Sequence, residues 1–202
     1  MAELSLGQQD FAPLRKDNLL YVDKTGELEE LIKNGRKYFL ARPEGFGKTL
    51  TLSTLSSMFQ GKAELFSNLL AEKWVRETSK RPYPVIRLDF RALNTQTFDK
   101  FAKSLQKMLF YVARNFKIEI DQDSLDDSLI DLLSKLYQEK GEIVHLIDNY
   151  EKPILESQSN LELLWPVHEV LKSFYEIIDA YNDHFRFLMI VGEEKYNKQG
   201  VF

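Results

Sequence analysis

Four short apolar runs, each separated from the next by a longer helical pattern, constrain the fold of this chain more than any other feature. The runs are "KYFLA" at residues 37–41, "VIRLDF" at 85–90, "EIVHLID" at 142–148 and "FRFLMIVG" at 185–192. They have the length of strands and are rich in β-branched and aromatic residues. Strands joined through helices make right-handed crossovers and lie parallel in the sheet. The sequence therefore predicts an α/β fold with a mainly parallel sheet, in which 37–41 reads as a buried strand.

The segments between these runs carry apolar residues at three-to-four spacing, which is typical of amphipathic helices. Thr25 is predicted to cap one helix at its start and Ser124 or Asp123 to cap another, and Gly61 is predicted to end a helix in the left-handed conformation. Residues 11–25 read as mainly irregular, and Pro166 as a kink or a helix start. We expect helices over 26–34, 50–59, 97–116, 124–141 and 161–183, with further helical structure within 63–79.

The composition favours one globular domain of ordinary size. The chain has 202 residues, of which 44% are hydrophobic and 29% charged, with a formal net charge of -4. This acidic balance makes nucleic acid an unlikely partner. There is no leader pattern, no cysteine, and no apolar run of roughly 18 residues that could span a membrane. We expect a cytoplasmic domain over 1–202, with an N-terminal segment and helix over 1–35 and a core over 36–202.

A glycine-containing loop joins the first strand run to a helix in "LARPEGFGKTLTLSTL", residues 40–55. A phosphate-binding loop needs a strand before it, free backbone amides, a lysine for the phosphates, a hydroxyl for Mg²⁺ and a helix after it. Gly45, Gly47, Lys48 and Thr49 supply these groups, but Arg42 stands where the motif usually opens with glycine. The alternative is an ordinary strand-to-helix turn with a solvated lysine.

Asp148 is the second signal, because it ends the third apolar run. The carboxyl ends of parallel strands meet at one edge of a sheet, where ligands bind. An acid at that edge can reach the magnesium ion of a nucleotide held by the loop. We therefore predict that Thr49 and Asp148 are the metal ligands, the alternative for Asp148 being a turn cap.

Five segments together resemble successive landmarks of the bacterial AAA-ATPase-like family: "NLLYVDKTGELEELI", "YFLARPEGFGKTLTLSTL", "YPVIRLDF", "LIDNYEKPIL" and "VGEEKYNK". Longer members of that family carry a C-terminal domain of the PD-(D/E)XK nuclease type. The resemblance covers almost the whole chain and implies a three-layer P-loop NTPase fold. Because the chain stops at Phe202, we expect it to lack the last strand and the lid of the fold.

The resemblance also implies residue roles. In the family the loop opens with an arginine-proline pair, as Arg42 and Pro43 do here. ATP and Mg²⁺ are the implied cofactors, and the block 21–25 is placed near the nucleotide or the first turn. The residues implied to bind nucleotide are Arg42, Gly45, Phe46, Gly47, Lys48, Thr49 and Leu50.

This sequence departs from the family at positions that matter for hydrolysis. Asn149 stands where a glutamate usually polarises the attacking water, and an amide cannot accept a proton. Glu151 is a candidate substitute, and Lys48 completes the predicted catalytic set. Glu44, in the loop, and Glu194, near a segment that resembles a sensor of the γ-phosphate, would both oppose phosphate.

These departures predict Mg²⁺-dependent ATP binding with slow or impaired hydrolysis. The alternative is a non-hydrolysing pseudo-ATPase interaction module. A small-molecule kinase ranks third, because no arginine-rich lid follows the third or fourth strand run. Beyond nucleotide, we expect partners to be a second copy of the chain or another protein.

Overall fold

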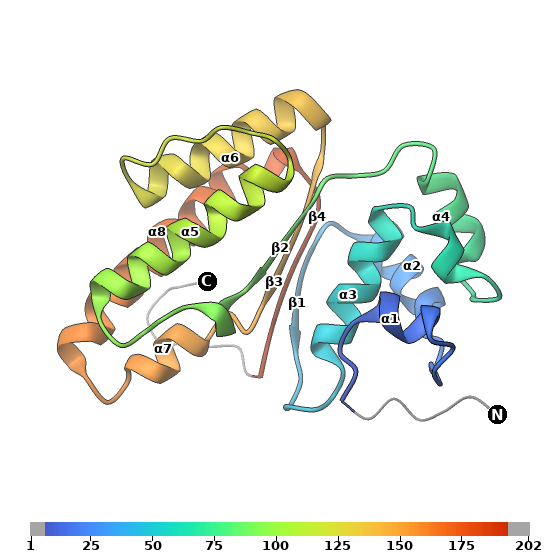
Figure 1. Cartoon of the computed structure of the whole chain (residues 1–202), viewed down its shortest axis with the longest axis horizontal. Helices are drawn as coiled ribbons and strands as arrows, with labels where there is room; N and C mark the ends of the chain where they lie inside the picture. The colour runs from blue at the N-terminus through green and yellow to red at the C-terminus, as the bar shows by residue number, and fades with distance from the viewer. Residues whose placement is uncertain (1–6, 194–202) are drawn as a thin grey trace.

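The computed structural model describes residues 7–193, and a four-stranded parallel sheet forms its centre (Figure 1). The strands lie in the order β1-β4-β3-β2, and each neighbouring pair is parallel. The predicted α/β class with a parallel sheet is confirmed. The strands are β1 (Lys37–Ala41), β2 (Val85–Asp89), β3 (Ile143–Asp148) and β4 (Phe185–Gly192).

Helices cover both faces of the sheet and give the molecule three layers (Figure 1). On one face lie α1 (Phe11–Lys16), α2 (Thr25–Asn34), α3 (Lys48–Phe59) and α4 (Glu72–Thr78). On the other lie α5 (Phe98–Asn115), α6 (Leu125–Lys140), α7 (Lys152–Ser157) and α8 (Leu161–Ala180). Short 3₁₀ turns span Ala63–Phe66, Phe90–Ala92 and Asn182–His184.

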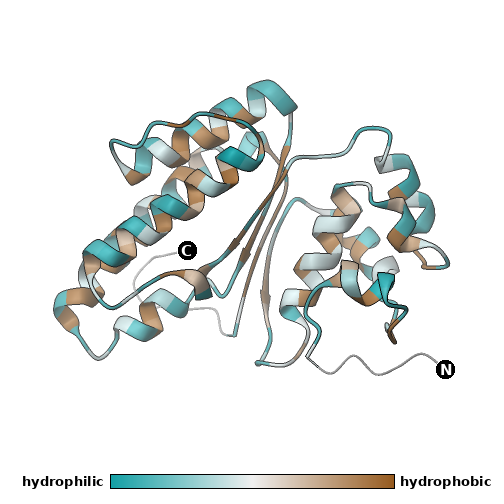
Figure 2. Cartoon of the chain, viewed as in Figure 1, coloured by the Kyte–Doolittle hydropathy of each residue, from teal (hydrophilic) through white to brown (hydrophobic). Residues whose placement is uncertain are grey.

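Two apolar clusters fill the spaces between the layers, and the strands between them are strongly hydrophobic (Figure 2). Leu52, Leu55 and Phe59 of α3 pack on one face of the sheet. Leu105 of α5 and Phe174 of α8 belong to the cluster on the other face. Because both faces are covered, all six residues of β3 are buried. This packing holds the carboxyl ends of the strands in fixed positions.

The prediction that 37–41 is a buried strand is wrong in one respect. The strand forms with the predicted bounds, but Lys37 and Ala41 are exposed and the residues between them are only partly buried. The reason is its position, because β1 lies at the end of the sheet and pairs only with β4 within 7–193.

Three predictions near helix ends also need correction. Residues 11–16 form α1 and are not irregular. Thr25 is the first residue of α2 and does not cap it; Asp23 accepts hydrogen bonds from its N–H and hydroxyl at 2.8 and 2.7 Å. Pro166 lies inside α8, which has already begun at Leu161, so the alternative that Pro166 starts the helix is wrong and a kink there stays a prediction. The predicted Ser124 cap and the left-handed Gly61 are confirmed.

The second and third strands are each one residue shorter than predicted, since a 3₁₀ turn begins at Phe90 and β3 begins at Ile143. The helical segment within 63–79 divides into a 3₁₀ turn and α4, and α7 was not predicted. Within the described part of the chain, no helix is both long and apolar enough to cross a membrane.

Candidate nucleotide-binding site

The loop between β1 and α3 has a backbone suited to holding phosphate. Gly45 and Gly47 have φ angles of 81° and 74°, in the left-handed region that residues with a side chain rarely adopt. Helix α3 begins at Lys48, directly after the loop, and no side chain caps it. The N–H groups of its first turn have no partner within the helix, and the helix dipole adds positive potential there. This environment favours an anion.

The side chain of Lys48 is held against the loop that precedes α3. The residue is only 7% exposed, and its ammonium donates hydrogen bonds of 2.6 and 3.1 Å to the carbonyl oxygens of Arg42 and Pro43. An ammonium has three N–H donors, so one remains for a ligand. The alternative of a solvated lysine in an ordinary turn does not agree with this burial.

Asp148, at the end of β3, is the buried acid of the site. It has no exposed surface, and neither carboxylate oxygen has a hydrogen-bond partner of ordinary geometry. Burial raises the pKa of Asp148, while the nearby Thr49 hydroxyl favours the charged form. Buried polar atoms without partners are uncommon, and binding of an ion is one physical reason for them. Mg²⁺ binds oxygen ligands and usually takes one or two carboxylates together with substrate phosphates. Thr49 and Asp148 therefore fit this ion.

A second acid, Asp89, ends the neighbouring strand, with Asp89 and Asp148 in register. Its carboxylate accepts a hydrogen bond of 3.0 Å from the Asn149 amide and bonds of 2.7–3.1 Å from the Arg91 guanidinium. Burial would raise the pKa of Asp89, but the hydrogen bonds from Arg91 and Asn149 bring it below its usual value. Asp89 is therefore charged at neutral pH. Sequence reasoning missed this cluster, although an acid at the end of a second strand run was a usable signal.

The loop lines a pocket of about 480 Å³, a size suited to a small-molecule ligand. Most of the residues predicted to bind nucleotide line it, and so does Asn149. Arg42 and Phe46 do not, and Phe46 is 64% exposed. The lining residues of the described chain are Gly7, Gln8, Gln9, Glu44, Gly45, Gly47, Lys48, Thr49, Leu50, Arg91, Asn149 and Glu193.

Glu151 lies in the turn after β3 and does not line the pocket. One of its carboxylate oxygens accepts a hydrogen bond of 2.8 Å from the N–H of Glu193, and a Cβ on Gly192 would overlap the other. Burial raises the pKa of Glu151, and the hydrogen bond from the Glu193 N–H and the charge of Lys48 partly offset this rise. Glu151 thus fastens this turn to the end of β4. The predicted sensor segment with Glu194 lies outside the described residues.

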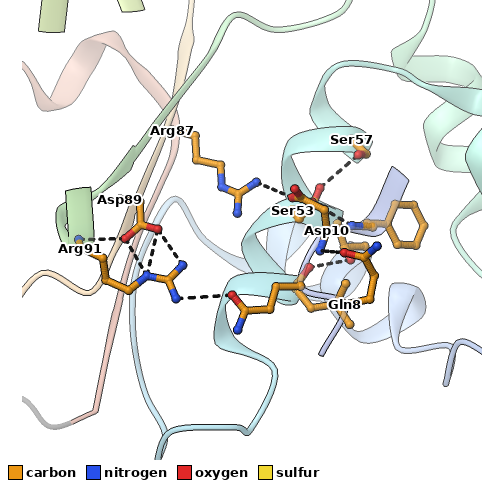
Figure 3. Close-up of polar contacts among 11 residues, drawn as sticks. Gln8, Asp10, Ser53, Ser57, Arg87, Asp89 and Arg91 are labelled. Carbon is orange, nitrogen blue, oxygen red and sulfur yellow. Dashed lines mark hydrogen bonds and ion pairs between the residues drawn. The ribbon is translucent and has the colours of Figure 1, made fainter. Parts of the chain in front are cut away.

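The N-terminal segment forms a wall of the pocket that sequence reasoning did not foresee. Asp10 accepts hydrogen bonds from Ser53 of α3 at 2.9 Å and from Arg87 of β2 at 3.0 Å (Figure 3). The N–H of Phe11 donates to the Ser53 hydroxyl at 3.0 Å. These bonds tie Asp10 and Phe11 to α3 and β2.

A left-handed glycine loop that opens α3, with a buried acid at the carboxyl edge of a parallel sheet, defines a domain of the P-loop NTPase type. The family model described as "AAA-ATPase_like: Predicted AAA-ATPase" matches residues 5–202. The chain therefore belongs to the predicted AAA-ATPase family, which confirms the resemblance seen in the sequence.

The chain is also similar to a curated relative described as "Uncharacterized protein in vnfD 5'region", from Azotobacter chroococcum mcd 1. The two are 32% identical over 203 residues, a match that covers 99% of this chain and 39% of the relative. The chain thus spans about two fifths of that relative's length. No solved structure matches the chain.

Proposed function

We propose that this chain binds ATP together with Mg²⁺ and hydrolyses it slowly. The observation that carries the proposal is the buried Asp148 carboxylate, which has no hydrogen-bond partner of ordinary geometry and lies near the Thr49 hydroxyl at the start of α3. Membership of the predicted AAA-ATPase family supports ATP as the nucleotide. The pocket beside the loop is large enough for a ligand of this kind.

Each group of the site has a role in this proposal. The first-turn N–H groups of α3 and the remaining Lys48 donor would hold the phosphates, and Thr49 with Asp148 would hold Mg²⁺. When bound, Mg²⁺ neutralises charge that develops on the transferred phosphoryl group. Arg42 contributes its carbonyl, which positions Lys48.

Slow hydrolysis is expected from two residues that follow β3, Asn149 and Glu151. Asn149 lines the pocket, but its side-chain amide donates to Asp89 and cannot accept a proton from water. Glu151 points to the end of β4 and is poorly placed as a replacement base. A positioned general base typically contributes 10²–10⁴ in rate, so turnover without one should be slower by about that factor.

A non-hydrolysing pseudo-ATPase module is the second candidate. Glu44 and Glu193 both line the pocket, and their carboxylates oppose a phosphate chain unless another cation compensates. Phosphate release separates the two functions, because a slow ATPase releases phosphate over hours and the module releases none.

Isothermal titration calorimetry tests the proposal. Wild-type protein should bind Mg-ATP, and EDTA or Asp148→Asn should weaken binding at least tenfold. Asp179→Asn is the matched control, because Asp179 is exposed and pairs with Lys37 away from the pocket. Binding that neither EDTA nor Asp148→Asn changes would contradict the proposed metal site. The domain extent of 1–202, a cytoplasmic location and assembly with a second copy or partner protein stay predictions from the sequence.

A further inference from the structure

Arg91 is a pocket residue to which the proposed function gives no role. It lies in the 3₁₀ turn after β2 and lines the pocket. Among the lining residues within 7–193, it and Lys48 carry positive charge, whereas Glu44 and Glu193 carry negative charge. The nearby charges of Asp148 and Glu44, beside that of Asp89, favour its charged form. Arg91 is therefore a cation among the acids of the site.

One edge of the Arg91 guanidinium is fixed by Asp89 (Figure 3). Its Nε donates to both carboxylate oxygens at 3.1 and 3.0 Å, and one terminal nitrogen donates at 2.7 Å. The other terminal nitrogen has a weaker contact of 3.4 Å with the side-chain oxygen of Gln9, on the N-terminal wall of the pocket. A guanidinium has five N–H donors. The edge away from Asp89 therefore has donors available toward the pocket.

The orientation of Asp89 is also fixed. Its carboxylate accepts the backbone N–H of Arg91 at 3.0 Å and the Asn149 amide at 3.0 Å. Asn149 has a φ angle of 55°, a left-handed conformation that asparagine tolerates better than most residues. Hydrogen bonds from two sides thus hold the acid that holds the arginine.

The order of the strands places Arg91 relative to the phosphates. Lys48 and Thr49 follow β1, Asp148 ends β3, and Arg91 follows β2 at the far end of the sheet order β1-β4-β3-β2. In phosphate loops the lysine reaches the β- and γ-phosphates and the hydroxyl binds Mg²⁺. A group beyond the proposed metal ligand would therefore face the terminal phosphate of a nucleotide held by the loop, and not its sugar or base.

We propose that Arg91 binds the terminal phosphate of the nucleotide through the guanidinium edge that Asp89 leaves free. Asp89 and Asn149 act as positioning residues for this contact. Arginine suits the task because its planar fork can donate two parallel hydrogen bonds to phosphate oxygens. The inference rests on the proposed function. It means that this chain itself supplies the arginine that contacts the terminal phosphate.

The same arrangement gives Asn149 a role in positioning Arg91. Its amide donates to the Asp89 carboxylate, whereas a glutamate at this position would place a second negative charge beside it. The amide therefore preserves the orientation of Arg91, at the expense of the general base.

Calorimetry with Mg-ATP and Mg-ADP on the same proteins tests the inference. Arg91→Gln should weaken Mg-ATP binding at least tenfold and Mg-ADP binding less than twofold, because ADP lacks the terminal phosphate. Arg91→Lys should have an intermediate effect on Mg-ATP, since it keeps the charge and loses the fork. Asp89→Asn should also reduce the preference for Mg-ATP over Mg-ADP, but by less than Arg91→Gln does.

Arg76→Gln is the matched control, because Arg76 binds Glu72 through two nitrogens on α4 and does not line the pocket. It should leave both affinities unchanged. Thermal midpoints of all variants show whether each is folded before titration. An equal effect of Arg91→Gln on both nucleotides, or none, overturns the inference. If Lys48→Ala still abolishes binding in that case, the proposed function stands; wild-type protein that binds neither nucleotide overturns both.

Discussion

Replacing Asp148 with asparagine should stabilise the nucleotide-free protein while it removes a ligand of the proposed metal site. The Asp148 carboxylate is fully buried, has no hydrogen-bond partner of ordinary geometry and lies beside charged Asp89. A buried polar group without a partner typically costs about 1–3 kcal/mol. Asparagine keeps the size of the side chain and removes a buried charge that lies beside the charge of Asp89. We expect a gain of about 1–3 kcal/mol, which for a chain of this size raises the thermal midpoint by about 2–12 °C.

The gain should depend on pH in a defined direction. The pKa of Asp148 is raised above 3.8, so the folded protein holds this proton more tightly than the unfolded chain. The contribution of Asp148 to the free energy of unfolding therefore falls as the pH rises from 3.8 to the raised pKa of the folded protein. Thermal denaturation at pH 4 and pH 7 checks this, with a larger stability difference between the two proteins expected at pH 7 than at pH 4. An Asp148→Asn protein less stable than wild type at pH 7 would refute the reasoning.

Three further predictions concern other parts of the chain. Gly192→Ala should destabilise the protein by about 1–3 kcal/mol in urea unfolding, because its Cβ would overlap the Glu151 carboxylate; unchanged stability would mean that the turn has room to shift. His145 is fully buried and its pKa is lowered to about 3, so the unfolded chain takes up a proton below pH 6.5 that the folded protein does not. Wild type should therefore lose about 1.6 kcal/mol between pH 6.5 and 5 from this residue, a loss that His145→Leu removes and that pH-dependent unfolding measures; the same slope in both proteins would speak against it. Asn149→Glu should raise phosphate release at saturating Mg-ATP at least tenfold but weaken Mg-ATP binding, because Asp89 loses a donor; an unchanged rate would place the limit on turnover elsewhere.

The strands were predictable because each is an apolar run bounded by turn residues. Their lateral order was not predictable from periodicity, and the partial exposure of β1 depends on that order. Helix α1 escaped prediction because "FAPLRK" is shorter than two helical turns and contains Pro13. Phe11 and Leu14 are the buried residues of α1, and a helix this short is stabilised by packing against other elements.

The parts of the site that lie in one local motif were also readable from the sequence. Lys48 and Thr49 belong to a strand-loop-helix pattern, and Asp148 ends a strand run. The contacts among Asp89, Arg91 and Asn149 could not be read, because they join the ends of two strands that are distant in sequence. The position of the N-terminal wall of the pocket could not be predicted either, because it depends on hydrogen bonds to α3 and β2.

The most direct test of the nucleotide site is a thermal-shift titration of wild type and Lys48→Ala with Mg-ATP. A ligand at 100 times its dissociation constant stabilises the folded state by about 2.7 kcal/mol, which corresponds to a midpoint shift of about 5–11 °C for a chain of this size. We predict this shift for wild type and its loss in Lys48→Ala, each measured against its own nucleotide-free midpoint. No shift in wild type, or an equal shift in both proteins, would contradict a nucleotide site built on this loop.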